Sequence, residues 1–503
     1  MRRSSRIGRT IALAACASTL MTMIGAAPAR AAAGTPRLFA QYSEVTLHRH
    51  STRAVFLNAG VFVEAVGGDL EFHVGRDDGY ASPITASQWA DGAKVQDLDP
   101  SLVDGWLGLA GFLHVQIKNP AGTVIEDRDM TWCPGGYGMQ RVDDSGPDLQ
   151  RLPQFGCYAM PFTLGTVWGI DQGWAAPVSD RYGSSEPVYI SGHDGTYHVT
   201  YSFPRPVAQA FGIPRDDRMA QVTVHVETTK KGHTAARATA AHAAAAPARD
   251  AAPRVPIDLN PDPSTVPDLI PLPAFGIDVY HRRSGGDFLA FGANIWSAGP
   301  APMDVEGFRR PDSGVMDAYE YFYDGDTPVG RAPVGTFEFD DRKGHHHWHM
   351  EQFARYSLLN ADQSEVVLSS KQSFCLAPTD PIDLRLPTAE WSPSWYGGGG
   401  LSTACGGSDA IWIREVLPVG WGDTYYQYVA GQSFNITHLP NGRYYVQVQA
   451  NPTGSMIETT QDNNVSLRRV ILRGKPGDRR VVVPPYMGID SESCLYCFRS
   501  PIG

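Results

Sequence analysis

Apolar and polar residues alternate in several short stretches of the chain. Between Arg443 and Gln449 the order is Arg-Tyr-Tyr-Val-Gln-Val-Gln, and a Pro-Asn-Gly turn at 440–442 precedes it. A period of two is typical of a half-buried β-strand. Residues 465–472 indicate another strand. We therefore expect a β-sandwich over residues 258–474.

The region before residue 229 also favours β structure. No long 3.6-residue periodicity occurs between residues 35 and 228. Residues 55–63 and 70–74 look like short strands, and residues 188–203 are interpreted as a hairpin with its turn at His193-Asp194-Gly195. The predicted fold class is mainly β, with two β-sandwich-like domains joined by an Ala/Pro-rich linker.

Composition marks the boundaries between these units. The 503 residues exceed one ordinary domain, and 52 Gly and 38 Pro favour turns over long helices. An Ala-rich stretch with several prolines follows residue 228, so residues 229–257 are expected to be the linker. The predicted organisation is a signal peptide (1–31), an N-terminal β domain of unassigned role (32–228), the linker, a second β domain (258–474) and a disulfide-held tail (475–503).

The N-terminus is typical of an export signal. Arginines at positions 2, 3, 6 and 9 precede the apolar run 11–24, and Ala29-Arg30-Ala31 fits a small-x-small cleavage site. Leu13-Ala14-Ala15-Cys16 superficially resembles a lipobox, but the apolar run continues beyond it. Arg2-Arg3 is a poor twin-arginine match. We expect a secreted protein, and no later segment is apolar enough to form a transmembrane span.

The net charge of −11, from 42 basic and 53 acidic residues, argues against a nucleic-acid partner. Six cysteines remain after the signal, and an even number in an exported protein favours disulfide bonds. Sequential pairing is the simplest, giving Cys133–Cys157, Cys375–Cys405 and Cys494–Cys497. The last pair could instead be a redox pair or half a zinc site, although no second CxxC completes such a site.

Four histidines fall within the five residues His345-His346-His347-Trp348-His349. Imidazole is the commonest side chain in Cu, Zn and Ni sites. On a strand His345, His347 and His349 share one face, but a flat strand separates the outer pair by roughly 13 Å. The strand must therefore bend, for which Gly344 is suited, or only two of them bind. A surface histidine tract is the alternative; the spacing does not separate copper from zinc.

The surrounding residues resemble the lysyl oxidase family over roughly residues 265–475. The family's copper segment has the pattern His-x-His-x-His, then Met, an acidic residue, Phe and Tyr-x-Leu-Leu, and residues 345–359 fit it closely. Lys371-Gln-Ser-Phe-Cys-Leu resembles the block that carries the cofactor lysine, and Gly420-Trp-Gly-Asp-Thr-Tyr425 the block that carries its tyrosine. Residues 434–444 and 458–465 resemble the strands that close the family's domain. HExxH and topaquinone motifs are absent.

The resemblance implies a bacterial lysyl oxidase-like, copper-dependent amine oxidase with copper at His345, His347 and His349. Lys371 and Tyr425 would form lysine tyrosylquinone, which no ordinary side chain replaces as an electrophile. Primary amines, with peptidyl lysine as one candidate, would become aldehydes with O2, releasing NH3 and H2O2. Asp423 is a weak candidate for the base, and His346 is predicted to be dispensable. Animal members of the family have more cysteines near the copper loop, whereas no cysteine flanks the histidines of this chain. Cys375 is therefore expected to pair with Cys405 instead.

A calcium site is a further expectation. Asp268-Leu269 opens the second domain, and Glu458, Asn463 and Asn464 lie in a turn near its end. Carboxylate, amide and backbone oxygens suit calcium, and similar positions bind it in some lysyl oxidase-like proteins. The same Asp, Glu and Asn residues would also be explained if they only formed turns.

Two other functions fit parts of this pattern. A non-enzymatic metal-binding protein of the cell surface or extracellular space would keep the histidines without using Lys371 or Tyr425. An adhesion protein would use both β domains for a partner and the metal for stability. Cross-linking of Lys371 to Tyr425 distinguishes the enzyme from both.

Overall fold

The structure, a computed structural model, describes residues 33–49, 54–136, 138–157, 159–180, 185–229, 255–283, 285–310, 313–341, 346–371, 373–394 and 398–492. All of them lie in one compact unit, residues 32–503, and the other unit is residues 1–31. The expected signal peptide, most of the expected linker, His345 and the Cys494–Cys497 pair lie outside the described residues.

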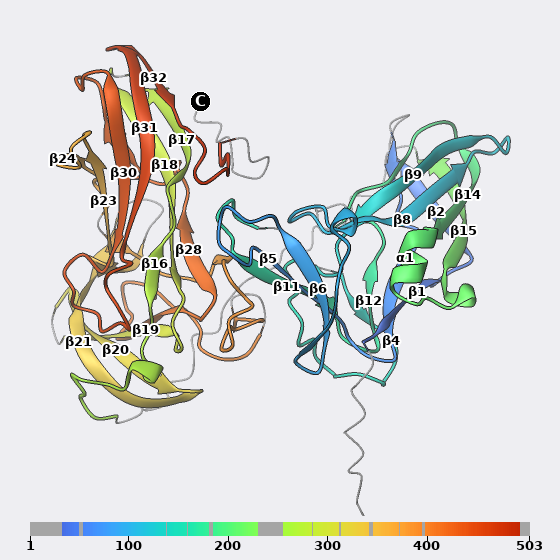
Figure 1. Cartoon of the computed structure of the whole chain (residues 1–503), viewed down its shortest axis with the longest axis horizontal. Coiled ribbons are helices and arrows are strands. Elements are labelled where there is room, and N and C mark those ends of the chain that lie inside the picture. Colours follow the sequence, from blue (N-terminus) through green and yellow to red (C-terminus); the bar gives the residue numbers. More distant parts are fainter. Residues whose placement is uncertain are drawn as a thin grey trace, which may run out of the picture. The chain divides into compact units, whose positions relative to one another are not determined.

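Strands dominate the described residues, which confirms the mainly-β fold class (Figure 1). The α-helix α1 (Arg205–Ala210) is one short turn-like segment, and the 3-10 helices η1 (Pro100–Leu102), η2 (Arg215–Asp217) and η3 (Pro263–Thr265) are shorter still. In the described part of the chain, no helix has the length and apolar character needed to cross a membrane.

The N-terminal region contains four sheets around one hydrophobic core. Valines and leucines from alternate positions, such as Val63, Val115 and Val199, are fully buried there. The sheets, in spatial order, are β1 (Thr35–Ala40), β4 (Val61–Val66), β12 (Trp174–Pro177), β10 (Gln140–Arg141); β11 (Gly165–Ile170), β5 (Leu70–Gly75), β6 (Thr85–Ala90), β7 (Ala93–Asp97); β13 (Tyr189–Ile190), β3 (Val55–Phe56); and β2 (Glu44–Arg49), β15 (Met219–Thr228), β14 (Gly195–Ser202), β8 (Leu109–Lys118), β9 (Val124–Trp132).

The predicted hairpin over residues 188–203 is wrong. Strand β13 pairs with β3, whereas β14 pairs with β8 and β15. The side chain of Asp194, in the expected turn, accepts a hydrogen bond from Thr228 N at 3.0 Å and forms an ion pair with Arg49. These contacts with distant segments hold the turn against β15, so β13 and β14 do not fold back on each other.

Three sheets of the C-terminal region enclose a second core, which includes Leu289, Val305 and Val446. In order they are β16 (Leu269–Pro271), β18 (Asp287–Ser297), β28 (Trp421–Tyr425), β26 (Asp380–Pro381), with β17 (Phe275–His281) and β29 (Ser433–Asn435) also on β18; β25 (Ser373–Phe374), β22 (His347–Glu351), β21 (Thr327–Asp340), β20 (Val315–Asp324), β19 (Met303–Arg309), β27 (Trp412–Leu417); and β24 (Glu365–Leu368), β23 (Ala354–Leu359), β30 (Gly442–Ala450), β31 (Val465–Lys475), β32 (Asp478–Val482).

The strand predicted from alternation at residues 443–449 corresponds to β30, and β31 contains the second predicted stretch. The start of the expected tail, residues 475–503, belongs to the same sheet as β31. Residues 478–482 form β32, which pairs with β31 through a tight turn. Gly477 in this turn and Gly474 near the end of β31 have positive φ (84° and 88°), a conformation that glycine adopts without steric cost.

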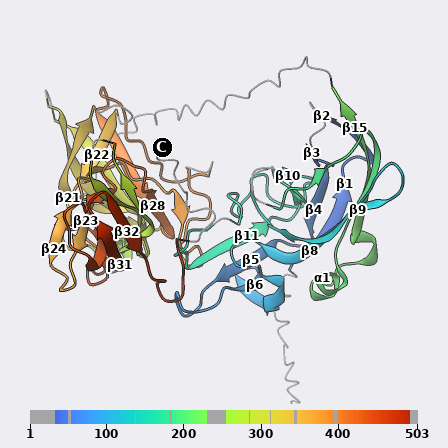
Figure 2. The same cartoon turned by 90° about the horizontal axis from the view of Figure 1, so that it is seen from above.

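Two strand pairings position the histidines, Lys371 and Tyr425. Strand β22, with two of the histidines, pairs with β25, which begins two residues after Lys371. Strand β28, which ends at Tyr425, belongs to another sheet and pairs with β18. Figure 2 shows β21, β22 and β28 in a second view.

Candidate functional site

His347 and His349 lie on the same face of β22, and their Nε2 atoms are 2.9 Å apart. His349 is buried and His347 is partly exposed. His346 precedes the strand, is exposed and has a φ of 53°. The backbone therefore changes direction at His346, so the chain before His347 does not continue a flat strand. His345 lies outside the described residues.

The two imidazoles fit a shared transition metal. Two nitrogens bound to one ion at about 2.0–2.1 Å and at right angles are about 2.9 Å apart. The other ring nitrogen of His349, Nδ1, is 3.4 Å from Oδ2 of Asp340 on the neighbouring strand β21. A carboxylate in this position fixes the ring orientation of a ligating histidine. Imidazole is a ligand of both copper and zinc, so the type of ligand does not separate the two metals.

Lys371 and Tyr425 are in contact. The Lys371 Nζ atom lies 4.3 Å from the centre of the Tyr425 ring and 4.8 Å from that of Phe374. Lys371 is only 7% exposed, an unusual environment for a lysine that serves no purpose beyond solubility. The Tyr425 hydroxyl donates to the Cys375 carbonyl at 3.0 Å and accepts from the Cys375 backbone N–H at 3.2 Å.

One short segment connects the histidines to this pair. Met350, next to His349, lies opposite Phe374 in the β22–β25 ladder, and Phe374 is followed by Cys375. A disulfide joins Cys375 to Cys405, and the Cys405 carbonyl accepts from Trp348 N at 3.0 Å. The backbone on both sides of the disulfide therefore contacts one or the other half of the site. The second expected pair within the described residues, Cys133–Cys157, is also joined.

Two buried carboxyl groups lie beside Tyr425. Burial raises the pKa of Asp423 to about 8, although the nearby Tyr425 and Lys371 lower it in part. Burial also raises the pKa of Glu415 well above its usual value, opposed by hydrogen bonds from the backbone N–H groups of Leu376 and Met350. A neutral carboxylic acid is thus favoured at Asp423 near pH 7, and burial acts in the same direction on the pKa of Glu415. Burial raises the pKa of the Tyr425 phenol as well, and both carboxylates add to this effect.

Sequence reasoning missed Glu415. It lies on β27 with Ile413 and Leu417, which are fully buried and share its face. This alternation was a readable signal, since it points a carboxylate into the core. Cys375, Cys405 and Glu415 offer three atoms close enough to hold an ion. The two sulfurs are bonded to each other, so this trio lacks the thiolates that a metal requires.

Tyr426 faces another environment. It stacks on Tyr428, with ring centres 5.6 Å apart, and packs at the edge of a separate apolar cluster. Lys371 also lines a cavity of about 230 Å³. Its walls include Gln352, Arg355 and Thr453, so polar groups surround the path to the lysine.

The residues expected to bind calcium are also brought together. Asn463 Nδ2 donates to both oxygens of Asp268, and Asn464 Nδ2 donates to Glu458 at 2.7 Å. Leu269 N donates to the other oxygen of Glu458. Burial raises the pKa of both carboxyl groups.

The amide oxygens at this site are suited to a cation. Within the described part of the chain, Oδ1 of Asn463 and Oδ1 of Asn464 are buried without a hydrogen-bond partner. Rotation of each amide would present an oxygen towards the carboxylates in place of the N–H donor. Two carboxylates and two such amides fit a hard cation. Asp462, which precedes Asn463 in the same turn, is exposed.

Part of the chain is similar to known proteins. Residues 331–478 match the lysyl oxidase family. The matched segment contains His347, His349, Lys371, Tyr425 and Glu458. It begins later than residue 265, where the sequence resemblance starts.

Relatives of the lysyl-oxidase-like segment include lysyl oxidase homolog 2 of Gallus gallus, 31% identical over 123 residues, and that of Homo sapiens, 30% identical over 123 residues. Each alignment covers 24% of this chain and 13% of the relative. Lysyl oxidase homolog 4 of Mus musculus is 31% identical over 136 residues, which is 27% of this chain and 16% of the relative. The chain therefore spans less than a fifth of the length of these relatives.

Proposed function

We propose that this chain is an exported, copper-dependent amine oxidase that converts primary amines to aldehydes with O2 and releases NH3 and H2O2. The observation that carries the proposal is the contact of Lys371 Nζ with the Tyr425 ring inside a buried site. The pairing of β25, the strand after Lys371, with the histidine strand β22 supports the proposal. The match of residues 331–478 to the lysyl oxidase family also supports it.

In this proposal copper is held by His345, His347 and His349. The convergence of two Nε2 atoms supports the role of His347 and His349, and Asp340 orients the ring of His349. His346 is assigned no role in binding, because its side chain is exposed.

Lys371 and Tyr425 are the proposed precursors of lysine tyrosylquinone. That group supplies an electrophilic carbonyl for amine capture, and copper supports its formation. The hydrogen bonds between the Tyr425 hydroxyl and the Cys375 backbone hold the ring in one orientation. Phe374, whose ring lies at 5.2 Å and nearly perpendicular to that of Tyr425, keeps water from this side.

Asp423 is the proposed base. It lies beside Tyr425, and burial gives it a pKa of about 8, so its carboxylate form is a stronger base than an exposed aspartate. The carboxylate takes a proton from the substrate carbon next to the amine nitrogen. Glu415 is not assigned this role, because its hydrogen bonds to backbone N–H groups give it a structural purpose.

The cavity of about 230 Å³ at Lys371 is the proposed route for the amine. Its volume lies below the roughly 300–1,000 Å³ of pockets for drug-sized ligands, which favours a slender group such as an alkylamine or a lysine side chain. Peptidyl lysine is therefore a candidate substrate together with small amines. The acidic chain as a whole attracts such cations.

Calcium at Asp268, Leu269, Glu458, Asn463 and Asn464 is part of the proposal. The buried amide oxygens without partners support it, and the carboxylates would hold the start of β16 against the turn before β31. Export through residues 1–31 is likewise proposed, and the two disulfides within the described residues suit an oxidising compartment. The domain boundaries given by the sequence stay predictions.

The test is H2O2 release from a panel of primary amines by copper-matured protein. Lys371→Arg and Tyr425→Phe keep charge and ring but remove the proposed cross-link, so each should lower the rate by at least about 100-fold. Tyr426→Phe is the matched control and should retain activity. Equal activity of the wild type and both variants would exclude the proposed cofactor. Copper binding without any amine oxidation would support a non-enzymatic metal protein.

A further inference from the structure

A second cavity, of about 800 Å³, lies away from Lys371 and Tyr425. One wall consists of strands β5, β6 and β7, and the other is the segment 383–391. The backbone joins these walls, because Leu164 N donates to the Ile382 carbonyl at 2.8 Å beside strand β11. Its volume falls within the roughly 300–1,000 Å³ range of ligand pockets.

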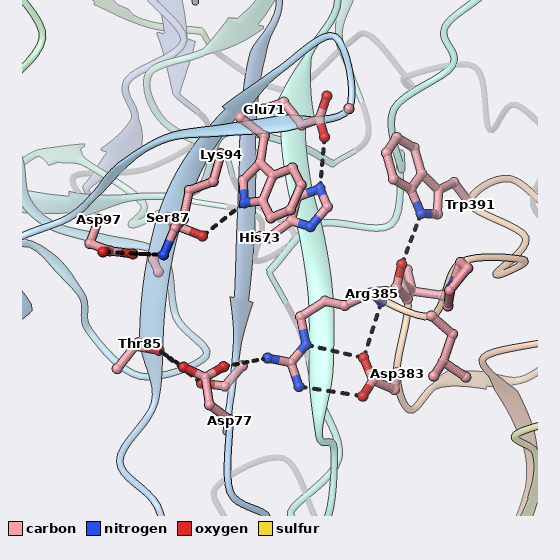
Figure 3. Close-up of a pocket in the computed structure, with 17 residues that line it drawn as sticks. Glu71, His73, Asp77, Thr85, Ser87, Lys94, Asp97, Asp383, Arg385 and Trp391 are labelled. Atoms are coloured by element: carbon pink, nitrogen blue, oxygen red, sulfur yellow. Dashed lines mark hydrogen bonds and ion pairs between the residues drawn. The ribbon is translucent and has the colours of Figure 1, made fainter.

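Three aromatic rings form the apolar part of this cavity. His73 stacks on Trp89, with ring centres 4.2 Å apart and planes within 12°. Trp391 lies edge-on to His73 at 6.0 Å (Figure 3). Both indole N–H groups already have acceptors, Ser87 Oγ for Trp89 and the Leu384 carbonyl for Trp391. The rings are therefore fixed, half-buried surfaces.

Charged side chains surround these rings in opposite pairs. Arg385 contacts both Asp383 and Asp77, at 3.1 Å and 3.0 Å, and Lys94 contacts Asp97 at 2.9 Å (Figure 3). Glu71 Oε1 accepts a hydrogen bond from His73 Nε2 at 2.7 Å. The cavity thus presents fixed hydrogen-bond donors and acceptors next to each other, and its cations are already matched by carboxylates.

This combination selects for a neutral ligand with many hydroxyl groups. The charged groups that line the cavity already contact one another: Asp77 and Asp383 contact Arg385, Asp97 contacts Lys94, and Glu71 contacts His73. A cationic or anionic ligand would therefore have to displace one of these contacts. A sugar ring offers C–H faces that pack on aromatic rings and hydroxyls that both donate and accept. The paired carboxylate and guanidinium groups match adjacent hydroxyls of such a ring.

We propose that the cavity between strands β5–β7 and the segment 383–391 binds a neutral oligosaccharide. Trp391 and Trp89 supply the stacking surfaces, and Asp77, Asp97 and Arg385 supply hydrogen bonds at the rim. The site is separate from the Lys371–Tyr425 site and does not depend on the proposed oxidase activity. It gives the N-terminal region a role in attaching the protein to a glycan.

Isothermal titration of the full chain with cellohexaose, chitohexaose and maltohexaose tests the proposal. At least one of these should bind, and Trp391→Ala should weaken its binding by roughly tenfold, the loss expected from one aromatic surface. Trp391→Phe should bind with intermediate affinity, because it keeps a ring at that position. Asp77→Asn should weaken binding by roughly three- to tenfold, since its exposed carboxylate is an acceptor.

Tyr42→Ala is the matched control. Tyr42 is an exposed aromatic residue of the same region that does not line the cavity, so this variant should bind as the wild type does. Thermal unfolding of each variant checks that it is folded. Binding of poly-L-lysine or heparin at the site without any of the hexasaccharides would overturn the proposal. Absence of binding, or equal affinity of the wild type, Trp391→Phe and Asp77→Asn, would also overturn it.

Discussion

The Nζ atom of Lys371 lies 4.3 Å from the centre of the Tyr425 ring, although the two residues are 54 positions apart in the chain. Lys371 precedes a strand, whereas Tyr425 lies at the end of one. Lys371 is positioned by the pairing of the following strand β25 with the histidine strand β22, whereas Tyr425 ends β28 in another sheet. The Cys375 backbone links the two sheets through the Tyr425 hydroxyl.

The histidines differ in their expected effect on copper binding. His347→Ala and His349→Ala remove a converging nitrogen, and each should lower copper affinity by more than about 100-fold. His346→Ala should leave it unchanged, because His346 is exposed and its backbone, rather than its ring, has the special conformation. The copper-to-protein ratio after dialysis against a weak chelator measures this. Equal loss of copper in all three variants would contradict the assigned ligands.

Asp423 gives the proposed reaction a characteristic pH dependence. Its pKa of about 8 means that the fraction of carboxylate, the form that accepts a proton, increases as pH rises through 8. We therefore expect kcat to rise between pH 6 and 9 with a midpoint near 8. Asp423→Asn should lower kcat by about 100-fold or more and remove this dependence.

A substrate whose amine has a low pKa should be used for this measurement. Its free-base fraction is constant across the range, so the substrate itself contributes no pH effect. A rate in the wild type that is level or falls between pH 6 and 9 would exclude Asp423 as the base. Full activity of Asp423→Asn would do the same.

Glu415 should matter for its shape and hydrogen bonds more than for its charge. Its raised pKa favours the neutral acid, which an amide mimics, so Glu415→Gln should fold with a small loss of stability. Glu415→Ala leaves the buried N–H groups of Leu376 and Met350 without their acceptor. The expected cost is about 2–4 kcal/mol of unfolding free energy. Chemical denaturation measures both variants, and equal stability of the two would contradict this account.

Calcium should stabilise the folded chain. After removal of divalent ions, calcium at about 100 times its Kd should add about 3 kcal/mol to the free energy of unfolding. Glu458→Gln should abolish this gain, because the amide lacks the charge that binds the ion. The melting temperature with and without calcium, and with magnesium for comparison, provides the measurement. An unchanged melting temperature of the wild type would count against the site.

The alternation of apolar and polar residues predicted strands β30 and β31, because each strand has one buried face and lies next to a turn. It also predicted that His347 and His349 share a face. It was wrong for residues 188–203, because the partners of β13 and β14 lie far away in the chain. Local sequence contains no information on a parallel pair such as β2 with β15, whose residues are about 180 positions apart.

The proximity of Lys371 and Tyr425 came from family resemblance rather than from periodicity. A lone lysine or tyrosine carries no mark of its partner. The buried carboxylate of Glu415 was readable only from its inward position on β27, and a single strand does not show what that face meets. Its neighbours, the Leu376 and Met350 backbones, belong to segments between 39 and 65 residues earlier in the chain.

The most direct test of the central claim is the mass of a tryptic peptide from reduced, copper-matured protein. Cleavage after Arg355, Arg385, Arg414 and Arg443 would leave residues 356–385 and 415–443 joined through Lys371 and Tyr425, because a modified lysine resists trypsin. We expect this branched peptide in the wild type and its absence from Lys371→Arg and from metal-free protein. Recovery of unmodified peptides 356–371, 372–385 and 415–443 from copper-matured protein would contradict the account.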